Sequence, residues 1–545
     1  MRFAFYTSGH GFGHATRVSA LSTELLKAGH GVTVVTNAPP LPFAAILPPS
    51  SLAAAPNGIS LDLPRYAAYR RRNVDAGIVQ PKAYDVDRRA TYAVLEGFMQ
   101  AREQILEEEI GWLKQEGIEA VLSDATFLGW SVEAAAAAGA GIPAIIVSNF
   151  TFDSCYSYLS HPALPPTVAG ADYPEAPLSP LELDPLVNQS IADYACASLL
   201  LRLPGAIPIP AFDTDVCMPA GRWVSDDRTC FVPEVEAILS RPTSAIPSVS
   251  NGTKKVVNVP LIVRPPSPSA NRPEFRRDLL ASMGVPDSLM DSKVLLVSFG
   301  GQAIPRPRSR PPSPLSSPLQ RPSSILSSSA SLEPPKPHSR EAGLLPKGWI
   351  AIVTGLSGGD NAIRHDLPWG FFASEKDVYV PDLTWVADCV LGKLVNRFFP
   401  HSPYCRGQIN QDHERARRAT ARVPRRFPAR PPSSTVRLLL FLLPVLPWML
   451  TPSPAVPRPL FVEEFGLKRL MQARGTSLEL DRADFEAGRW EFHVEEAYAH
   501  GRAAKEEARR TGFVDEKAGE VIRREIETFM EQQKRKGAPG AAGSR

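Results

Sequence analysis

Apolar runs bounded by glycine-rich turns alternate with helical patterns through the first 235 residues. An apolar run at 3–6 enters a turn with glycines at 9, 11 and 13, and a helical pattern follows from Ala15 to about Lys27. Further apolar runs lie at 31–37, 120–124 and 142–148, with helical patterns over 98–116 and 130–138. Strands that alternate with helices through short turns predict a parallel, doubly wound sheet.

A second alternating pattern begins near residue 256. An apolar run at 293–298 again enters a glycine turn, and further strands are expected at 349–355 and 378–380. Residues 385–391 are expected to form a short helix and the start of a strand, and 481–533 predict charged helices. In the first half, Glu107, Glu108 and Glu109 are expected on a solvated helix face. The chain is therefore predicted to be an α/β protein with two domains.

Two segments interrupt the second pattern. Residues 303–342 hold 10 Pro and 11 Ser in 40 positions, and so little apolar surface cannot offset the entropy cost of ordering, which predicts a disordered insertion. Residues 395–437 hold ten Arg, no Lys and two acidic residues. Because these arginines lack regularly interleaved aromatics, no nucleic acid partner is predicted.

The apolar run at 438–450 raises the question of a membrane helix. It has thirteen residues and contains Pro444 and Pro447, whereas a helix needs about 20 apolar residues to span a bilayer and tolerates proline poorly. No stable membrane span is expected.

The composition and the cysteine spacing indicate the compartment in which the protein works. The 43% hydrophobic and 21% charged content is ordinary for a soluble protein, while the 55 prolines are about twice the usual share. The six cysteines show no CxxC spacing, and the start lacks a charged leader followed by a long apolar core. A reducing, cytoplasmic environment is therefore expected.

The first glycine turn carries two imidazoles, His10 and His14. A strand that enters such a turn and a helix N-terminus presents backbone N–H groups to a polar ligand, and a titratable base there indicates chemistry. Three other interpretations stay open. The histidines can bind a metal from i and i+4, although no third ligand stands at useful spacing. A nicotinamide dinucleotide site is disfavoured because the turn reads G-x-G-x-G and the next strand ends in Asn37. A histidine can also simply cap or pack the turn.

The motif Ser8-Gly-His-Gly-Phe-Gly-His-Ala-Thr-Arg17 resembles the opening of GT-B nucleotide-sugar glycosyltransferases. Within that group it is most similar to the glycosyltransferase-like N-terminal region of L-arabinokinases. The resemblance continues through Val121–Asp124, Val147–Phe150, Leu201–Pro204, Val259–Arg264, Ser298–Gln302, Asp388–Lys393 and Arg458–Glu464. The sugar-kinase half of arabinokinases is expected to be absent, because no Gly-Leu-Ser-Ser-Ser phosphate loop occurs.

This resemblance implies two Rossmann-like domains that face a cleft, with disordered insertions. Residues 1–235 are then the N-terminal acceptor domain, and 236–302, 343–394 and 458–535 make the C-terminal donor domain. The Ser/Pro-rich insertion is 303–342, and the Arg/Pro-rich segment 395–457 departs from the family.

The resemblance also implies an enzyme, a hexosyltransferase that uses a nucleotide sugar, UDP-linked, and inverts the anomeric carbon. His14 matches the base that removes the proton of the acceptor hydroxyl, and Asp124 matches the carboxylate that orients it. The turn on the acceptor side is Gly9, His10, Gly11, Gly13 and Arg17. On the donor side the matching residues are Gly300, Gly301, Gln302, Asp382, Glu463 and Glu464. No metal and no cofactor are implied, and the acceptor is not identified.

One departure sets an alternative. After Leu394 the family continues with a Gly-Tyr-Gly-Thr turn and a nearby Ser-Glu that line the donor diphosphate, whereas this chain enters its Arg/Pro segment. The alternative is a non-catalytic nucleotide-sugar-binding or regulatory module, or an inactive product of a faulty gene model.

We hypothesise that 395–457 is translated intron or out-of-frame sequence, because the composition changes abruptly there and the family pattern resumes near 456–458. Sequencing of the mature transcript is expected to return messages that lack this stretch in frame. A mature message that encodes it in frame contradicts the hypothesis.

Overall fold

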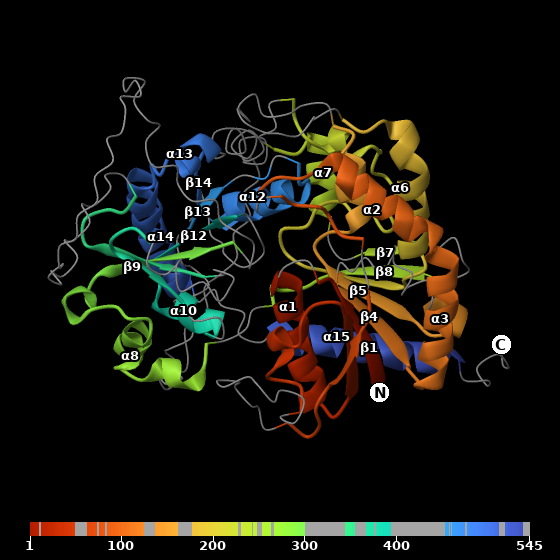
Figure 1. Cartoon of the computed structure of the whole chain (residues 1–545). Helices are drawn as coiled ribbons and strands as arrows, with labels where there is room; N and C mark the ends of the chain where they lie inside the picture. Colours follow the sequence, from red (N-terminus) through yellow and green to blue (C-terminus); the bar gives the residue numbers. More distant parts are fainter. Residues whose placement is uncertain are drawn as a thin grey trace, which may run out of the picture.

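Two parallel sheets, one in each half of the chain, organise the computed structural model (Figure 1). The structure describes residues 1–9, 12–48, 63–73, 76–81, 84–124, 137–161, 177–226, 230–241, 244–247, 253–262, 266–299, 344–354, 367–374, 378–393, 453–456, 458, 460–474, 477–511 and 518–537. The insertion 303–342 and most of 395–457 lie outside these ranges.

The first sheet has the strand order β3-β2-β1-β4-β5-β6-β8-β7. Its strands are β1 (Arg2–Thr7), β2 (Gly31–Thr36), β3 (Ala68–Arg71), β4 (Ala120–Asp124), β5 (Ala144–Ser148), β6 (Leu199–Arg202), β7 (Ser244–Pro247) and β8 (Thr253–Asn258). All neighbours pair in parallel except β7, which runs antiparallel to β8. The order from β3 to β6 is the doubly wound order of Rossmann folds, with its reversal between β1 and β4.

The second sheet repeats this arrangement, in the order β11-β10-β9-β12-β13-β14. Its strands are β9 (Lys293–Ser298), β10 (Trp349–Val353), β11 (Phe371–Ala373), β12 (Cys389–Lys393), β13 (Ser453–Val456) and β14 (Ser477–Glu479), all parallel. The predicted α/β fold class with two Rossmann-like domains is therefore confirmed.

Helices cover both faces of each sheet. In the first half these are α1 (Phe12–Lys27), α2 (Arg88–Gln100), α3 (Arg102–Gln115), α5 (Phe152–Tyr158), α6 (Pro180–Tyr194) and α7 (Pro233–Leu239). Later in the chain come α8 (Phe275–Ser282), α10 (Val380–Val386), α12 (Glu463–Arg474), α13 (Arg482–Glu486), α14 (Glu491–Thr511) and α15 (Ala518–Gly537).

The strands are apolar on both faces because each face meets a helical layer. Along β1, Ala4 and Tyr6 enter the core beneath α2, α3, α5 and α6, whereas Phe3 and Phe5 enter the core shared with α1. Side chains alternate across a strand, so a strand buried on both faces shows a continuous apolar run instead of a polar alternation. This is the pattern that predicted β1, β4, β5 and β9.

Two helices from the C-terminal part of the chain pack on the first half. The last helix, α15, lies beside α1 and β1, and its Ile522, Ile526 and Phe529 enter the same core as Phe3 (Figure 1). The start of α12 also enters the first half's core through Phe465, together with Val462 directly before the helix. Sequence order alone had placed both helices with the donor domain.

The boundary at 236 also differs from the structure. Strands β7 and β8 extend the first sheet because β8 pairs with β6 in parallel. At the other end of the Arg/Pro segment, β13 pairs with both β12 and β14, so residues 453–456 belong to the second sheet.

Two local expectations were wrong. The strand expected at 378–380 is absent, since α10 begins at Val380 with Pro381 in its first turn, a position that proline favours. Glu109, expected in solvent, is fully buried and accepts hydrogen bonds from Tyr6 Oη (2.6 Å) and Arg70 (2.7 and 2.8 Å). Hydrogen bonds from Tyr6 and Arg70, which lie far away in the sequence, offset the desolvation of this carboxylate. No local pattern reveals such partners.

The docking of α15 predicts a large effect of a small change. Ile526→Ala removes a fully buried side chain from the core shared with α1, and such truncations typically cost about 2–5 kcal/mol. We expect a clearly lower thermal midpoint in a fluorescence melt. Gln532→Ala, at an exposed position of the same helix, serves as the matched control, and equal midpoints for the two variants would argue against the docking.

Candidate functional site

The best candidate site lies where the first sheet reverses its strand order. The residues pair so that Thr7, the end of β1, stands beside Asp124, the end of β4. In open parallel sheets the connections leave this point toward opposite faces, which leaves a crevice outside the carboxyl ends of the strands. The β1–α1 turn and the segment after β5 therefore meet at one edge.

His14, Arg17 and Asp124 converge at this edge. Arg17 binds the carboxylate with both arms of its guanidinium, through Nε to Oδ2 at 2.9 Å and through Nη2 to Oδ1. The ring of His14 stands next to both groups, with Nδ1 3.5 Å from Asp124 Oδ1 and 3.2 Å from Arg17 Nη2. The predicted acid–base pair is thus in contact, with an arginine as its third member.

The Asp124 carboxylate is held in its charged form. Its side chain is 1% exposed, and burial acts to raise the pKa, yet the Arg17 guanidinium and the adjacent His14 ring outweigh burial and hold the pKa of Asp124 below its usual range. An ionised carboxylate beside an imidazole can fix the ring tautomer and stabilise an imidazolium.

Asn149 extends this cluster toward the second half of the chain. Its Oδ1 accepts from Arg17 Nη1 at 3.4 Å, and its Nδ2 donates to Glu463 Oε1 on α12 at 3.3 Å. The motif Val147–Phe150 contained this residue, but no chemical pattern in the sequence singled it out. Hydrogen bonds therefore link His14 to the acidic pair predicted for the donor side.

That acidic pair is buried and engaged with cations. Glu463 lies 3.4 Å from Arg458 Nη2, and Glu464 lies 3.2 Å from Lys468 Nζ. Burial raises the pKa of Glu464, against the opposing charges of Lys468 and Arg458. Both carboxylates thus lie beside cations at the junction of α12 with the first half.

A glycine is needed where α12 approaches the first half. A Cβ on Gly466 would stand 2.4 Å from the carbonyl oxygen of Gly205, so no larger residue fits without moving backbone. The close approach fixes the position of Glu463 relative to Asn149.

The remaining turn residues are partly described. Gly9 lies against the second strand's end, because a Cβ there would meet Asn37 Oδ1 at 1.9 Å. Gly13 opens α1 and its carbonyl accepts from the Thr16 hydroxyl at 2.9 Å. His10 and Gly11 lie outside the described residues.

The second sheet has a matching reversal between β9 and β12. Gly392 is required there, since a Cβ would stand 2.4 Å from the Ser298 carbonyl oxygen. Gly300, Gly301 and Gln302 follow β9 directly but lie outside the described residues. Asp382, at the start of α10, accepts hydrogen bonds from the backbone N–H (2.6 Å) and the hydroxyl (2.7 Å) of Ser267. Burial raises the pKa of Asp382.

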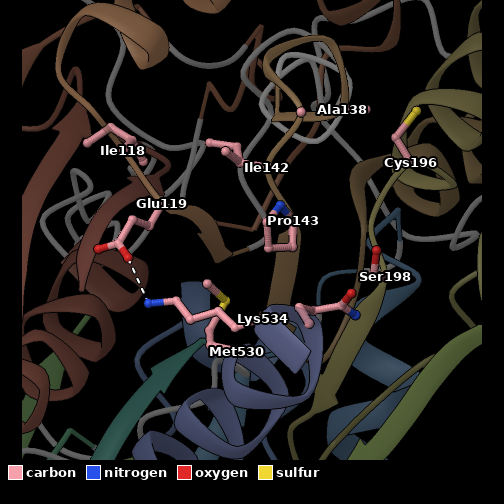
Figure 2. Close-up of a pocket in the computed structure, with 11 residues that line it drawn as sticks. Ile118, Glu119, Ala138, Ile142, Pro143, Cys196, Ser198, Met530 and Lys534 are labelled. Atoms are coloured by element: carbon pink, nitrogen blue, oxygen red, sulfur yellow. Dashed lines mark hydrogen bonds and ion pairs between the residues drawn. The ribbon is translucent and has the colours of Figure 1, made fainter. Parts of the chain in front are cut away.

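A separate cavity lies at the opposite edge of the first sheet. It measures about 570 Å³ and opens between Ile118 and Pro143, which precede β4 and β5, and Met530 of α15. Glu119 and Lys534 face each other across it at 3.0 Å (Figure 2). Because Asp124 ends the strand that Glu119 precedes, this cavity is remote from the His14 cluster.

Within the described ranges, no group of three metal-binding side chains comes together. A search of the same residues finds no helix with the length and apolar character that crossing a bilayer requires.

Sequence reasoning missed one buried acid, which follows the carboxyl end of β5. Asp153 in α5 is fully buried, and neither carboxyl oxygen makes a well-formed hydrogen bond to a described group. Burial raises the pKa of Asp153 to about 7, and the nearby Thr151 hydroxyl and backbone N–H groups offset only part of that effect.

Comparisons with known proteins give one sequence relative. Over 393 residues, 72% of this chain, the sequence is 29% identical to an L-arabinokinase of Arabidopsis thaliana. The match spans 26% of that protein, so the chain covers about a quarter of its length. The similarity to L-arabinokinase predicted from the motifs is confirmed. No family model matches the chain.

Solved structures of glycosyltransferases align over nearly the whole chain. The calicheamicin glycosyltransferase CalG4 is 15% identical, with 97% of this chain and 98% of that chain covered and a TM-score of 0.43. UGT73P12 of Glycyrrhiza uralensis is 11% identical, with 98% and 96% covered and a TM-score of 0.42. Since both scores are below 0.5, the fold assignment rests on the strand order of the two sheets.

Asp153 predicts an unusual pH dependence of stability. The pKa of Asp153 is higher in the folded state than in the unfolded chain. The contribution of the protonated carboxyl to the free energy of unfolding is therefore complete at low pH and is lost as the pH rises from about 4 to about 7. At about 1.4 kcal/mol per pKa unit, the loss reaches about 4 kcal/mol. Asp153→Asn is expected to remove this dependence in urea unfolding across a pH series. Asp215→Asn, at an exposed site, is the control, and a wild-type pH profile in the Asp153 variant would contradict the assignment.

Proposed function

We propose that the chain is a glycosyltransferase that moves a hexosyl group from a nucleotide sugar, UDP-linked, to an acceptor hydroxyl with inversion. The observation that carries the proposal is the contact of His14 with the buried, ionised Asp124 at the reversal point of the first sheet. A base next to a carboxylate, at the place where doubly wound sheets bind ligands, suits removal of a hydroxyl proton.

In this proposal the chemistry is a single displacement. The acceptor oxygen attacks the anomeric carbon as its proton passes to the free ring nitrogen of His14, and the bond to the nucleotide diphosphate breaks on the opposite face. Asp124 stabilises the imidazolium that forms. The departing diphosphate takes the electron pair of the broken bond and gains one negative charge, which balances the positive charge that His14 gains with the proton.

The donor would bind at the reversal point of the second sheet. The turn after β9, with Gly300, Gly301 and Gln302, would offer backbone N–H groups to the phosphates. We propose Glu463 and Glu464 as donor-side residues, although both already have partners in the protein. A donor hydroxyl must compete with Asn149 for Glu463 and with Lys468 for Glu464.

One observation favours the alternative, a nucleotide-sugar-binding module without turnover. Both donor-side carboxylates are already bound to cations, and Arg17 occupies Asp124 with both arms. With its carboxylates engaged in this way, such a site can bind a ligand although no group in it is free to remove a proton.

Calorimetric titration with a panel of UDP-hexoses, followed by a UDP-release assay with mixed hydroxyl acceptors, separates the two functions. We expect binding and release in the wild type, with release lowered roughly 100- to 10,000-fold in His14→Ala, the usual contribution of a general base. His493→Ala, which changes a histidine paired with Asp484 in the second half, is the matched control and should keep its activity.

Binding without release in the wild type would support the module. Absence of binding would contradict both functions and support a defective product. Equal release by the wild type and His14→Ala would remove His14 from the mechanism.

A further inference from the structure

The Nδ1 atom of His14 faces two groups with opposite demands. Arg17 Nη2 stands 3.2 Å away and can only donate a hydrogen bond, whereas Asp124 Oδ1 stands 3.5 Å away and can only accept one. A neutral imidazole carries its proton on one nitrogen. Nδ1 therefore serves Arg17 as an acceptor or Asp124 as a donor, never both.

The choice decides whether the ring can act as a base. If Nδ1 carries the proton and donates to Asp124, Nε2 has a free lone pair that can take a proton from a substrate. If Nδ1 accepts from Arg17, the proton sits on Nε2 and that nitrogen becomes a donor. The shorter distance, to Arg17, favours the second form.

Arg17 is held rigidly in the position that enforces this choice. Its side chain is 6% exposed, its Nε and Nη2 bind the two oxygens of Asp124, and its Nη1 donates to Asn149 at 3.4 Å. A guanidinium stays charged and donor-only at any working pH. It cannot adapt to the ring by giving up a proton.

We propose that Arg17 is a positioning residue that keeps His14 in the Nε2–H tautomer, in which the ring is a hydrogen-bond donor and not a base. The hydrogen bonds that hold Arg17 run through Asn149 to Glu463 on α12. The atom of Arg17 that faces the ring, Nη2, is itself anchored by Asp124. The ring gains the Nδ1–H form that donates to Asp124 only when this guanidinium moves off Nδ1.

The catalytic meaning of this switch rests on the proposed function, but the ring state does not. It makes transfer dependent on a displacement of Arg17, since the base becomes competent only when Arg17 leaves Nδ1.

Nitrogen-15 NMR of histidine-labelled protein tests the inference without substrate or turnover. Spectra are recorded above about pH 8, where an ordinary imidazole is neutral, and His14→Gln identifies the signals of His14 among the 10 histidines. We expect the Nε2–H form in the wild type. Arg17→Gln should shift the tautomer ratio at least about tenfold toward Nδ1–H, as expected for loss of a charge-assisted hydrogen bond.

Two further variants make the result specific. Arg17→Lys keeps a charge beside Asp124 but lacks the planar fork, so it should fold and give an intermediate ratio. Arg102→Gln breaks another arginine–carboxylate pair, with Asp193, and should leave His14 unchanged.

A wild-type His14 ring that carries its proton on Nδ1 overturns the inference. This measurement uses the wild-type protein, so it does not depend on the folding of any variant. An unchanged tautomer in Arg17→Gln and Arg17→Lys overturns it too. Since the readout is the ring itself, a lack of UDP release would refute the proposed transfer and leave this inference intact.

Discussion

The reversal of strand order beside β1 and beside β9 is the constraint on which the rest of the structure depends. At each reversal the connecting helices leave toward opposite faces, so the carboxyl ends of the strands stay uncovered. In the first sheet this brings the β1–α1 turn, Asp124 and Asn149 to one edge although more than a hundred residues separate the first from the others. The candidate site exists because of this geometry, not because of any local motif alone.

Charge balance then decides the character of that edge. Asp124, Glu463 and Glu464 are all buried, and each has a cation within reach: Arg17, Arg458 or Lys468. Burying an unpaired carboxylate costs far more than burying a paired one. Asp153 is the contrasting case, because it is fully buried without a well-formed hydrogen bond, and burial raises its pKa to about 7.

The two halves of the chain are joined by elements that return to the first sheet. Helix α12 places Glu463 against Asn149, and α15 fills the core beside α1. Two further contacts act in the same way: Arg482 binds Asp85 (2.6 Å), and Arg469 binds Glu236 (2.6 Å). The two halves of the chain are therefore coupled through hydrogen bonds and ion pairs as well as through packing.

The sequence by itself predicted β1, β2, β4, β5, β9 and β10, because strands buried on both faces leave continuous apolar runs. The family resemblance, not a local pattern, pointed to His14 and Asp124 as a pair. The sequence could not place β8 or α15, since both carry an apolar face that either sheet could cover, and only packing chose the first. Nor could it show that Glu109 is buried, or that Arg17 contacts both His14 and Asp124. Those facts depend on contacts between residues far apart in the chain, and such contacts are decided only when the tertiary structure forms.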